Sequence, residues 1–238
     1  MSEARGEIAY GEQRITFSLR HADRQTLEIA VRPDGEVDVV APLGTVYADI
    51  HARLVKRARW IAAQRAYFAQ FDPRTPVRRF VGGETHLYLG RHYRLKISPA
   101  DADNVRLMGG RFMIDVVGSA SPERVGSLLA DWYAAKADDR LAERLGECWT
   151  RFSSDRAAGV PPLRIRRMRA RWGSMSEGGM LTLNVDLIRA PRECIDYVIL
   201  HELCHLEYPD HGPGFRARLE HVLPDWRQRK HRLELTLS

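Results

Sequence analysis

The chain has few cysteines and no long apolar run, and both shortages narrow its class. Its 238 residues include three cysteines, Cys148, Cys194 and Cys204, an odd number with no CxxC pair. A disulfide framework is therefore not expected, and a reducing cytoplasm fits this usage best. No stretch approaches the roughly eighteen consecutive apolar residues of a membrane span, so we expect no membrane contact. The first seven residues contain no apolar segment, which predicts that there is no secretory signal.

The chain also has no large excess of positive or negative charge. Lys and Arg number 37 against 31 Asp and Glu, which gives a formal net charge of +6 at pH 7. This surplus attracts polyanions at long range, so charge alone leaves nucleotide and nucleic-acid partners open. The hydrophobic fraction of 44% and the aromatic fraction of 8% are typical of a globular protein long enough for a sizeable core.

Alternation of apolar and polar residues predicts several strands in the first half of the chain. The expected strands are 14–19, 26–32, 36–41, 86–89, 92–97, 105–108 and 111–116. Pro33-Asp34-Gly35 is a turn sequence between the second and the third, so we expect a hairpin or meander there. Between the two groups of strands, apolar side chains recur every three to four residues over 45–71 and predict one long amphipathic helix.

The best domain boundary in the sequence is Gly118-Ser119-Ala120-Ser121-Pro122. Ser121 followed by Pro122 is a typical helix start, because Pro is favoured at the first helical position. Apolar residues then recur over 125–149 and predict a second long helix. We therefore expect a β-rich N-terminal region at 1–118 and a separate, more helical domain at 119–238.

Residues 198–206 contain His201-Glu202-Leu203-Cys204-His205 among apolar neighbours, a pattern that predicts a metal-binding helix. Residues four apart lie on nearly the same face of a helix, so His201 and His205 can share one metal ion. Glu202 lies next to this pair, where its carboxylate can reach a water on the metal. These parts predict a zinc hydrolase that uses a zinc-bound water and Glu202 as the general base.

A catalytic zinc usually takes three protein ligands, so we expect one more ligand besides His201 and His205. The candidates are His211, Glu220 and His221. We expect the metal helix to end near Tyr208, because Pro209 disfavours helical geometry in the residue before it. The chain then turns back, and five residues separate His205 from His211, as in the HExxHxxGxxH metalloproteases. We favour His211, with Glu220 as the rival.

The arginine-rich stretch 163–175 is strand-like, and Glu177-Gly178-Gly179 turns the chain back into Met180–Asn184. We therefore expect a hairpin whose second strand, Met180–Asn184, is a free edge beside the metal. A free strand edge can bind an extended substrate backbone, because it offers unpaired N–H and C=O groups.

Several of these segments together resemble a known family. They are Arg171-Trp172-Gly173-Ser174, Leu183-Asn184, Ile195-Asp196-Tyr197-Val198, His201 to Leu206, and His211 with Phe215. This set is similar to the YgjP-like metallopeptidase family, which is related to the SprT-like and WLM zinc peptidases. Met175 stands where the family usually has a cysteine, and Asp210-His211-Gly212 replaces its usual Asn-His-Ser.

The resemblance implies an α+β protein with a zincin-like helical catalytic domain and a small antiparallel sheet after the β-rich first half. It also implies one zinc per chain, held by His201, His205 and His211, and Glu202 as the catalytic base. We therefore expect a cytoplasmic zinc metallopeptidase that acts on peptides or proteins.

Two alternatives stay open, namely hydrolysis of nucleotide phosphoanhydrides at the same metal and protein processing on nucleic acid. The sequence lacks a complete glycine-rich phosphate motif, which disfavours the first of them. The sequence gives no indication of the oligomeric state.

Overall fold

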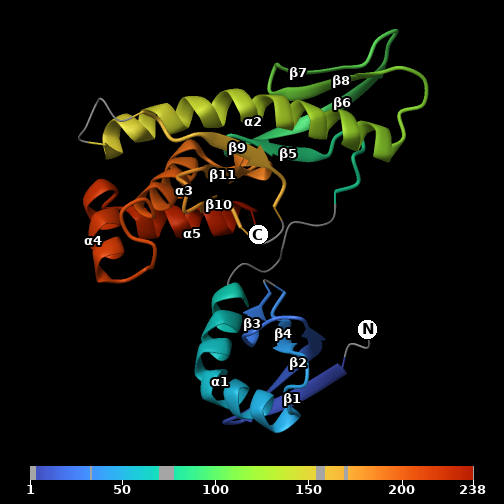
Figure 1. Cartoon of the computed structure of the whole chain (residues 1–238). Helices are drawn as coiled ribbons and strands as arrows, with labels where there is room; N and C mark the ends of the chain where they lie inside the picture. Colours follow the sequence, from blue (N-terminus) through green and yellow to red (C-terminus); the bar gives the residue numbers. More distant parts are fainter. Residues whose placement is uncertain (1–3, 33, 70–77, 154–158, 169–170, 238) are drawn as a thin grey trace. The chain divides into compact units, whose positions relative to one another are not determined.

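Figure 1 shows the computed structural model of the chain, in which residues 4–32, 34–69, 78–153, 159–168 and 171–237 are described. The chain forms two compact units, residues 1–75 and 76–237, and each has its own buried core. The boundary expected at residue 118 falls inside the second unit, because the strands before it and the helix after it share one core.

The first unit is a four-stranded sheet in the order β1-β2-β4-β3, with a helix packed against it. The strands are β1 (Ala4–Tyr10), β2 (Gln13–Ala22), β3 (Glu28–Val31) and β4 (Val37–Pro42). β1 pairs with β2 and β3 pairs with β4 in antiparallel hairpins, but β2 and β4 run parallel, so the sheet is not a simple meander. The helix α1 (Tyr47–Ala69) confirms the amphipathic pattern, since it buries Ile50, Leu54, Ala58 and Ile61.

The second unit begins with another four-stranded sheet, in the order β5-β6-β8-β7. Its strands are β5 (Thr85–Tyr88), β6 (Arg91–Pro99), β7 (Asn104–Met108) and β8 (Arg111–Val116). The long helix α2 (Pro122–Phe152) starts at the expected place, where the Ser121 side chain accepts a hydrogen bond from the Arg124 N–H. α2 packs on β7 and β8, and the rings of Phe112 and Trp132 meet edge to face at 5.0 Å. This shared core joins the sheet to the part of the chain that contains His201, Glu202 and His205.

A third, smaller sheet has the order β10-β11-β9. Its strands are β9 (Leu163–Arg166), β10 (Gly173–Met175) and β11 (Leu181–Asn184). β11 is antiparallel to β10 and parallel to β9, so the sheet is mixed and not antiparallel. The expectation that Met180–Asn184 forms a free edge is wrong, because two separate pieces of the arginine-rich stretch pair with it, one on each side. The edge strand that contacts α3 (Arg192–Cys204), the helix that carries His201 and Glu202, is β10.

The remaining elements are η1 (Val185–Arg189), α3 (Arg192–Cys204), α4 (Pro213–Val222) and α5 (Trp226–Leu237). α3 contacts α2, α4 and α5, and Figure 1 shows these helices gathered beside one end of α2. Cys148 of α2 and Cys194 and Cys204 of α3 are free and buried in this core. In the described part of the chain, no helix is both long and apolar enough to cross a membrane.

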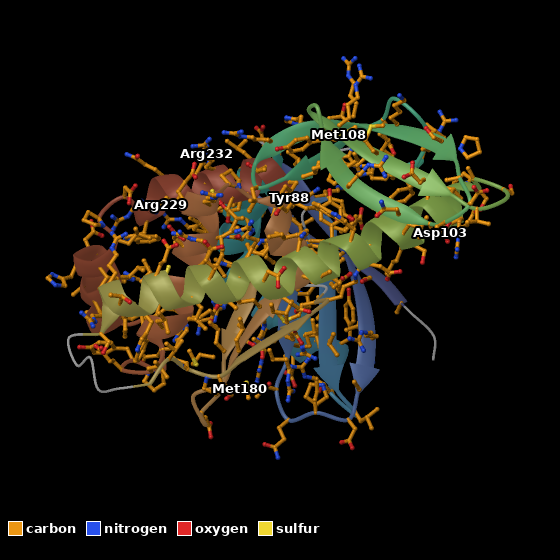
Figure 2. All side chains as sticks on the ribbon, turned by 90° about the horizontal axis from the view of Figure 1, so that it is seen from above. Tyr88, Asp103, Met108, Met180, Arg229 and Arg232 are labelled. Carbon is orange, nitrogen blue, oxygen red and sulfur yellow. The ribbon has the colours of Figure 1, made fainter. Side chains whose placement is uncertain are left out.

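An ion-pair network fixes α3 between its neighbours. Arg144 of α2 donates from Nε and Nη2 to the two carboxylate oxygens of Asp196 on α3, at 2.8 and 2.7 Å. Arg229 of α5 lies 4.0 Å from the same carboxylate and pairs with Asp225 at 2.9 Å. Figure 2 labels Arg229, which lies near Arg232. The Asp196 side chain is only 13% exposed, so its charge depends on these arginines for compensation.

Asp196→Ala is expected to destabilise the protein by about 2 kcal/mol, because it removes the largely buried carboxylate that accepts two hydrogen bonds from Arg144, which then keeps only the exposed Glu147 as a partner among the described residues. Asp225→Ala is the matched control. Its carboxylate is 46% exposed and makes an ion pair with Arg229, and a pair whose acid faces solvent contributes less than about 1 kcal/mol. Urea unfolding of both variants measures the difference, and equal losses of stability in the two would contradict a structural role for the buried network.

Candidate metal centre

The His201-Glu202-Leu203-Cys204-His205 motif lies at the end of α3. His201 is in the last turn of the helix, and His205 is its C-cap residue with φ −70° and ψ −13°. The helix therefore ends earlier than the expected position near Tyr208. After Cys204 the chain continues in tighter turns, with His205 N–H donating to Glu202 O at 3.1 Å and Leu206 N–H donating to Leu203 O at 3.0 Å. These turns bring the following segment back towards the helix.

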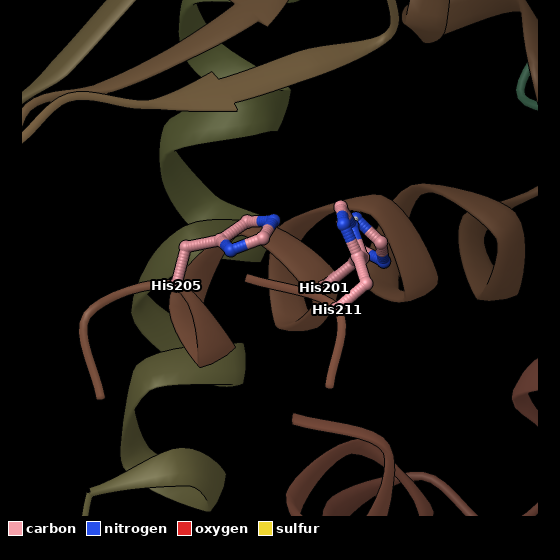
Figure 3. A group of neighbouring side chains, drawn as sticks. All are labelled: His201, His205 and His211. Carbon is pink, nitrogen blue, oxygen red and sulfur yellow. Dashed lines mark hydrogen bonds between the residues drawn. The ribbon is translucent and has the colours of Figure 1, made fainter. Parts of the chain in front are cut away.

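His211 comes from that returning segment and joins the two histidines of α3. One ring nitrogen from each of His201, His205 and His211 lies within 4.8 Å of the others. Nε2 of His211 is 3.1 Å from Nε2 of His201. Figure 3 shows the three imidazoles converging from the helix and from the segment after it.

A backbone carbonyl determines which ring nitrogen of His205 carries the proton. His205 Nδ1 lies 3.0 Å from the carbonyl oxygen of Tyr208. Because a carbonyl only accepts, Nδ1 must carry the proton and donate it, and the lone pair is then on Nε2. A backbone carbonyl on the second ring nitrogen is the usual partner of a metal-ligating histidine. In contrast, Nδ1 of His201 is buried without a hydrogen-bond partner among the described residues.

The donor set fits a zinc ion. Burial, with the charges of His211 and His205, lowers the pKa of His201 to about 3. Burial and the charge of His205 also lower the pKa of His211. These two rings are therefore neutral at pH 7 and keep the lone pairs that a metal needs. Two nitrogen ligands of a tetrahedral zinc lie about 3.4 Å apart, close to the separation of the two Nε2 atoms, and three histidines are an established catalytic zinc set.

The two rival ligands lie elsewhere. Glu220 of α4 accepts hydrogen bonds from Trp226 Nε1 at 2.8 Å and from Arg227 Nη1 at 2.9 Å. His221 is exposed on the same helix. Among the described residues, the structure therefore brings His211, and neither of its rivals, to the pair on α3.

Glu202 is on the adjacent face of α3, beside the edge strand β10. It is 7% exposed. Burial raises the pKa of its carboxyl to about 7, while the Met175 N–H and the charge of Arg171 oppose part of that rise. A carboxylate with a pKa near 7 is well matched to general base catalysis at neutral pH.

The histidines and Glu202 open into a pocket of about 820 Å³. β10 and its flanks form one side of this pocket and α3 forms another. Lys230, Leu233 and Glu234 of α5 complete it. Sequence reasoning missed the contribution of α5, although Lys230, Leu233 and Glu234 have the i, i+3, i+4 spacing that indicates one common helix face.

A family model described as the YgjP-like metallopeptidase domain matches residues 25–236 of the chain. The chain belongs to the YgjP-like metallopeptidases. It is accordingly a metal-dependent hydrolase whose substrates are peptides or proteins, which confirms the resemblance read from the motifs. The family match also covers most of the β-rich first half, beyond the C-terminal segments that carried the resemblance.

Two solved structures are similar to part of this YgjP-like chain. They are the metallopeptidase zymogens abylysin of Pyrococcus abyssi and jannalysin of Methanocaldococcus jannaschii. Their sequence identities are 23% and 21%, and each has a TM-score of 0.33. Each covers 38% of this chain, and the matches span 87% and 83% of those two chains. A comparison with curated proteins gives no match.

Proposed function

We propose that this YgjP-like protein is a zinc peptidase in which His201, His205 and His211 hold one zinc and Glu202 is the general base. The observation that carries the proposal is the convergence of three histidine nitrogens within 4.8 Å, next to a buried carboxylate in a pocket. A zinc ion there would supply a Lewis acid for the substrate carbonyl and lower the pKa of a bound water to about 7.

Glu202 moves the proton of the reaction. Its carboxylate accepts a proton from the attacking water, whose oxygen adds to the carbonyl carbon of the scissile peptide. When the C–N bond breaks, Glu202 returns that proton to the departing amine. The second proton of the water leaves the new carboxyl group and also ends on the amine, so the products are a carboxylate and an ammonium group. Proton transfer by a positioned group of this kind contributes about 10²–10⁴ in rate.

The free edge of β10 is our candidate for holding the substrate backbone. Trp172 O accepts a hydrogen bond from Asn184 N–H, and Ser176 N–H donates to Met180 O, so these groups of Trp172 and Ser176 face β11. In an antiparallel pair such residues alternate with residues whose N–H and C=O point away from the partner strand. Gly173 and Met175 are the alternate residues, so their backbone groups face the outer edge. The Met175 N–H contacts the Glu202 carboxylate there, and the other outward groups of these two residues are left for a substrate. An extended peptide can add to that edge as a further strand.

A reducing cytoplasm is the compartment that we propose for this activity. The three cysteines of the chain are all free and buried. Proteins of oxidising compartments tend to pair their cysteines in disulfides, so this usage supports a cytoplasmic location.

Removing the metal tests the proposal directly. The purified protein is expected to contain about one zinc per chain, to lose cleavage of an unfolded protein after chelation, and to regain it with added zinc. Nucleotides and DNA, assayed in parallel, are expected to remain intact. Full peptidase activity after verified removal of all transition metal would refute the zinc mechanism.

A further inference from the structure

The edge strand β10 has a glycine, Gly173, at a point where it passes close to the side chain of Glu202. A Cβ atom placed on Gly173 would lie 2.8 Å from Cγ, 2.9 Å from Oε1 and 3.1 Å from Cδ of Glu202. Real Cβ atoms essentially never show contacts below 3.0 Å, so any larger residue at this position displaces something. The space in which the Glu202 side chain lies exists because residue 173 has no side chain.

Backbone conformation does not explain this glycine. Its φ lies outside the left-handed range that favours glycine, in contrast to Gly179 in the turn that follows. Gly173 is a strand residue paired with Leu183, and glycine weakens a strand because it has no side chain to pack. Close approach of Glu202 is the feature that requires it.

The same strand also holds the other end of the Glu202 side chain. The Met175 N–H faces the carboxylate, and its direction away from β11 leaves it available for that contact. Gly173 therefore admits the Cγ and Cδ atoms of Glu202, and Met175 orients the oxygens.

We propose that Gly173 and the Met175 N–H form a slot that positions Glu202 for proton transfer, and that Gly173 is a positioning residue of the peptidase. This inference rests on the proposed role of Glu202 as the base. It assigns to the edge strand a second task, distinct from binding the substrate backbone.

The surroundings decide which atoms would move if the slot were filled. Leu183, the partner of Gly173 on β11, is completely buried, as are Ile199 and Leu203 on the turns of α3 next to Glu202. Both backbones are therefore held by the core, and the side chain of Glu202 is the part that can rotate. Gly173→Ala is expected to move the carboxylate away from the Met175 N–H while the fold and the histidine cluster persist.

The first measurement separates kcat from KM. Gly173→Ala is expected to lower kcat for an unfolded protein by about a hundredfold, as a misplacement of about 1 Å can do, with KM little changed. Zinc content per chain should stay the same. Gly178→Ala is the matched control, because a Cβ there would come no nearer than 3.9 Å to any other group, and it should keep the activity of the wild type.

A thermal-unfolding cycle gives a readout that does not depend on activity. Gly173→Ala is expected to lower the unfolding midpoint of the wild type but not that of Glu202→Ala, in which Cγ and Oε1 are absent. Coupling between two contacting residues is what such a cycle measures. Equal effects of Gly173→Ala in both backgrounds would overturn the slot.

A second pair of variants tests the slot if Gly173→Ala folds poorly. Met175→Pro removes the N–H that faces Glu202 without removing a bond to β11, and Pro is tolerated on an edge strand. It should lower kcat strongly, whereas Met175→Leu, which keeps the N–H, should not. Normal kcat in both Gly173→Ala and Met175→Pro, with loss of activity in Glu202→Gln, would overturn the inference and leave the proposed function standing. An active Glu202→Gln would instead remove the proposed function, and the unfolding cycle would still report on the slot.

Discussion

Glu202→Gln is expected to lower kcat by about 10²–10⁴ while the protein still binds one zinc, because the amide keeps the shape of the side chain but cannot accept the proton. The carboxylate is buried and lines the same pocket as the three histidines, so we expect its loss to remove the general base. The measurement is kcat on an unfolded protein, with zinc quantified in the same preparation. KM should change little, since the substitution removes an interaction made in the transition state.

Glu207→Gln is the control for this result. Glu207 follows α3, pairs with Arg218 at 3.0 Å and is exposed, so the same chemical change there should leave kcat unaltered. Turnover by Glu202→Gln within threefold of the wild type would show that Glu202 is not the base.

His211→Ala is expected to weaken zinc binding by more than about a hundredfold, since substitution of even an outer partner of a metal ligand costs 10–100-fold. His211 brings its Nε2 to 3.1 Å from that of His201, whereas Glu220 is held by Trp226 and Arg227. Competition for zinc with a chromogenic chelator gives the affinities. Glu220→Ala should match the wild type in that titration.

The reverse pattern, with weak binding in Glu220→Ala and normal binding in His211→Ala, would move the third ligand to α4. A moderate loss in both variants would also contradict the assignment, because the two side chains have different partners in the structure.

The elements that depend on local spacing could be predicted from the sequence. The helix expected over 45–71 is α1 (Tyr47–Ala69), and Ser121 with Pro122 marked the start of α2. The convergence of His201 and His205 follows from one turn of helix, and the position of His211 follows from a short return of the chain. Each of these relations spans few residues, so periodicity and turn chemistry are enough to predict it.

Pairing between distant segments could not be predicted in this way. Residues 163–175 looked like one strand, but the structure splits them into β9 and β10 on opposite sides of β11. The parallel pairs β2–β4 and β6–β8 also join segments that the alternation pattern treats alike. Which strand becomes the edge is decided by tertiary packing, and the same is true of the domain boundary, since α2 buries the sheet that precedes it. The slot at Gly173 depends on a contact between β10 and α3, which no local pattern contains.

The three buried cysteines of the second unit can report on local unfolding of that unit. Burial raises the pKa of Cys148 and Cys204 to about 12 and that of Cys194 to about 11, so almost no thiolate is present at pH 7. A thiol reagent can then react only with molecules that have transiently opened. Cys194 and Cys204 lie near the two ends of α3, so the relative rates of their alkylation distinguish fraying of one end of this helix from unfolding of the whole unit.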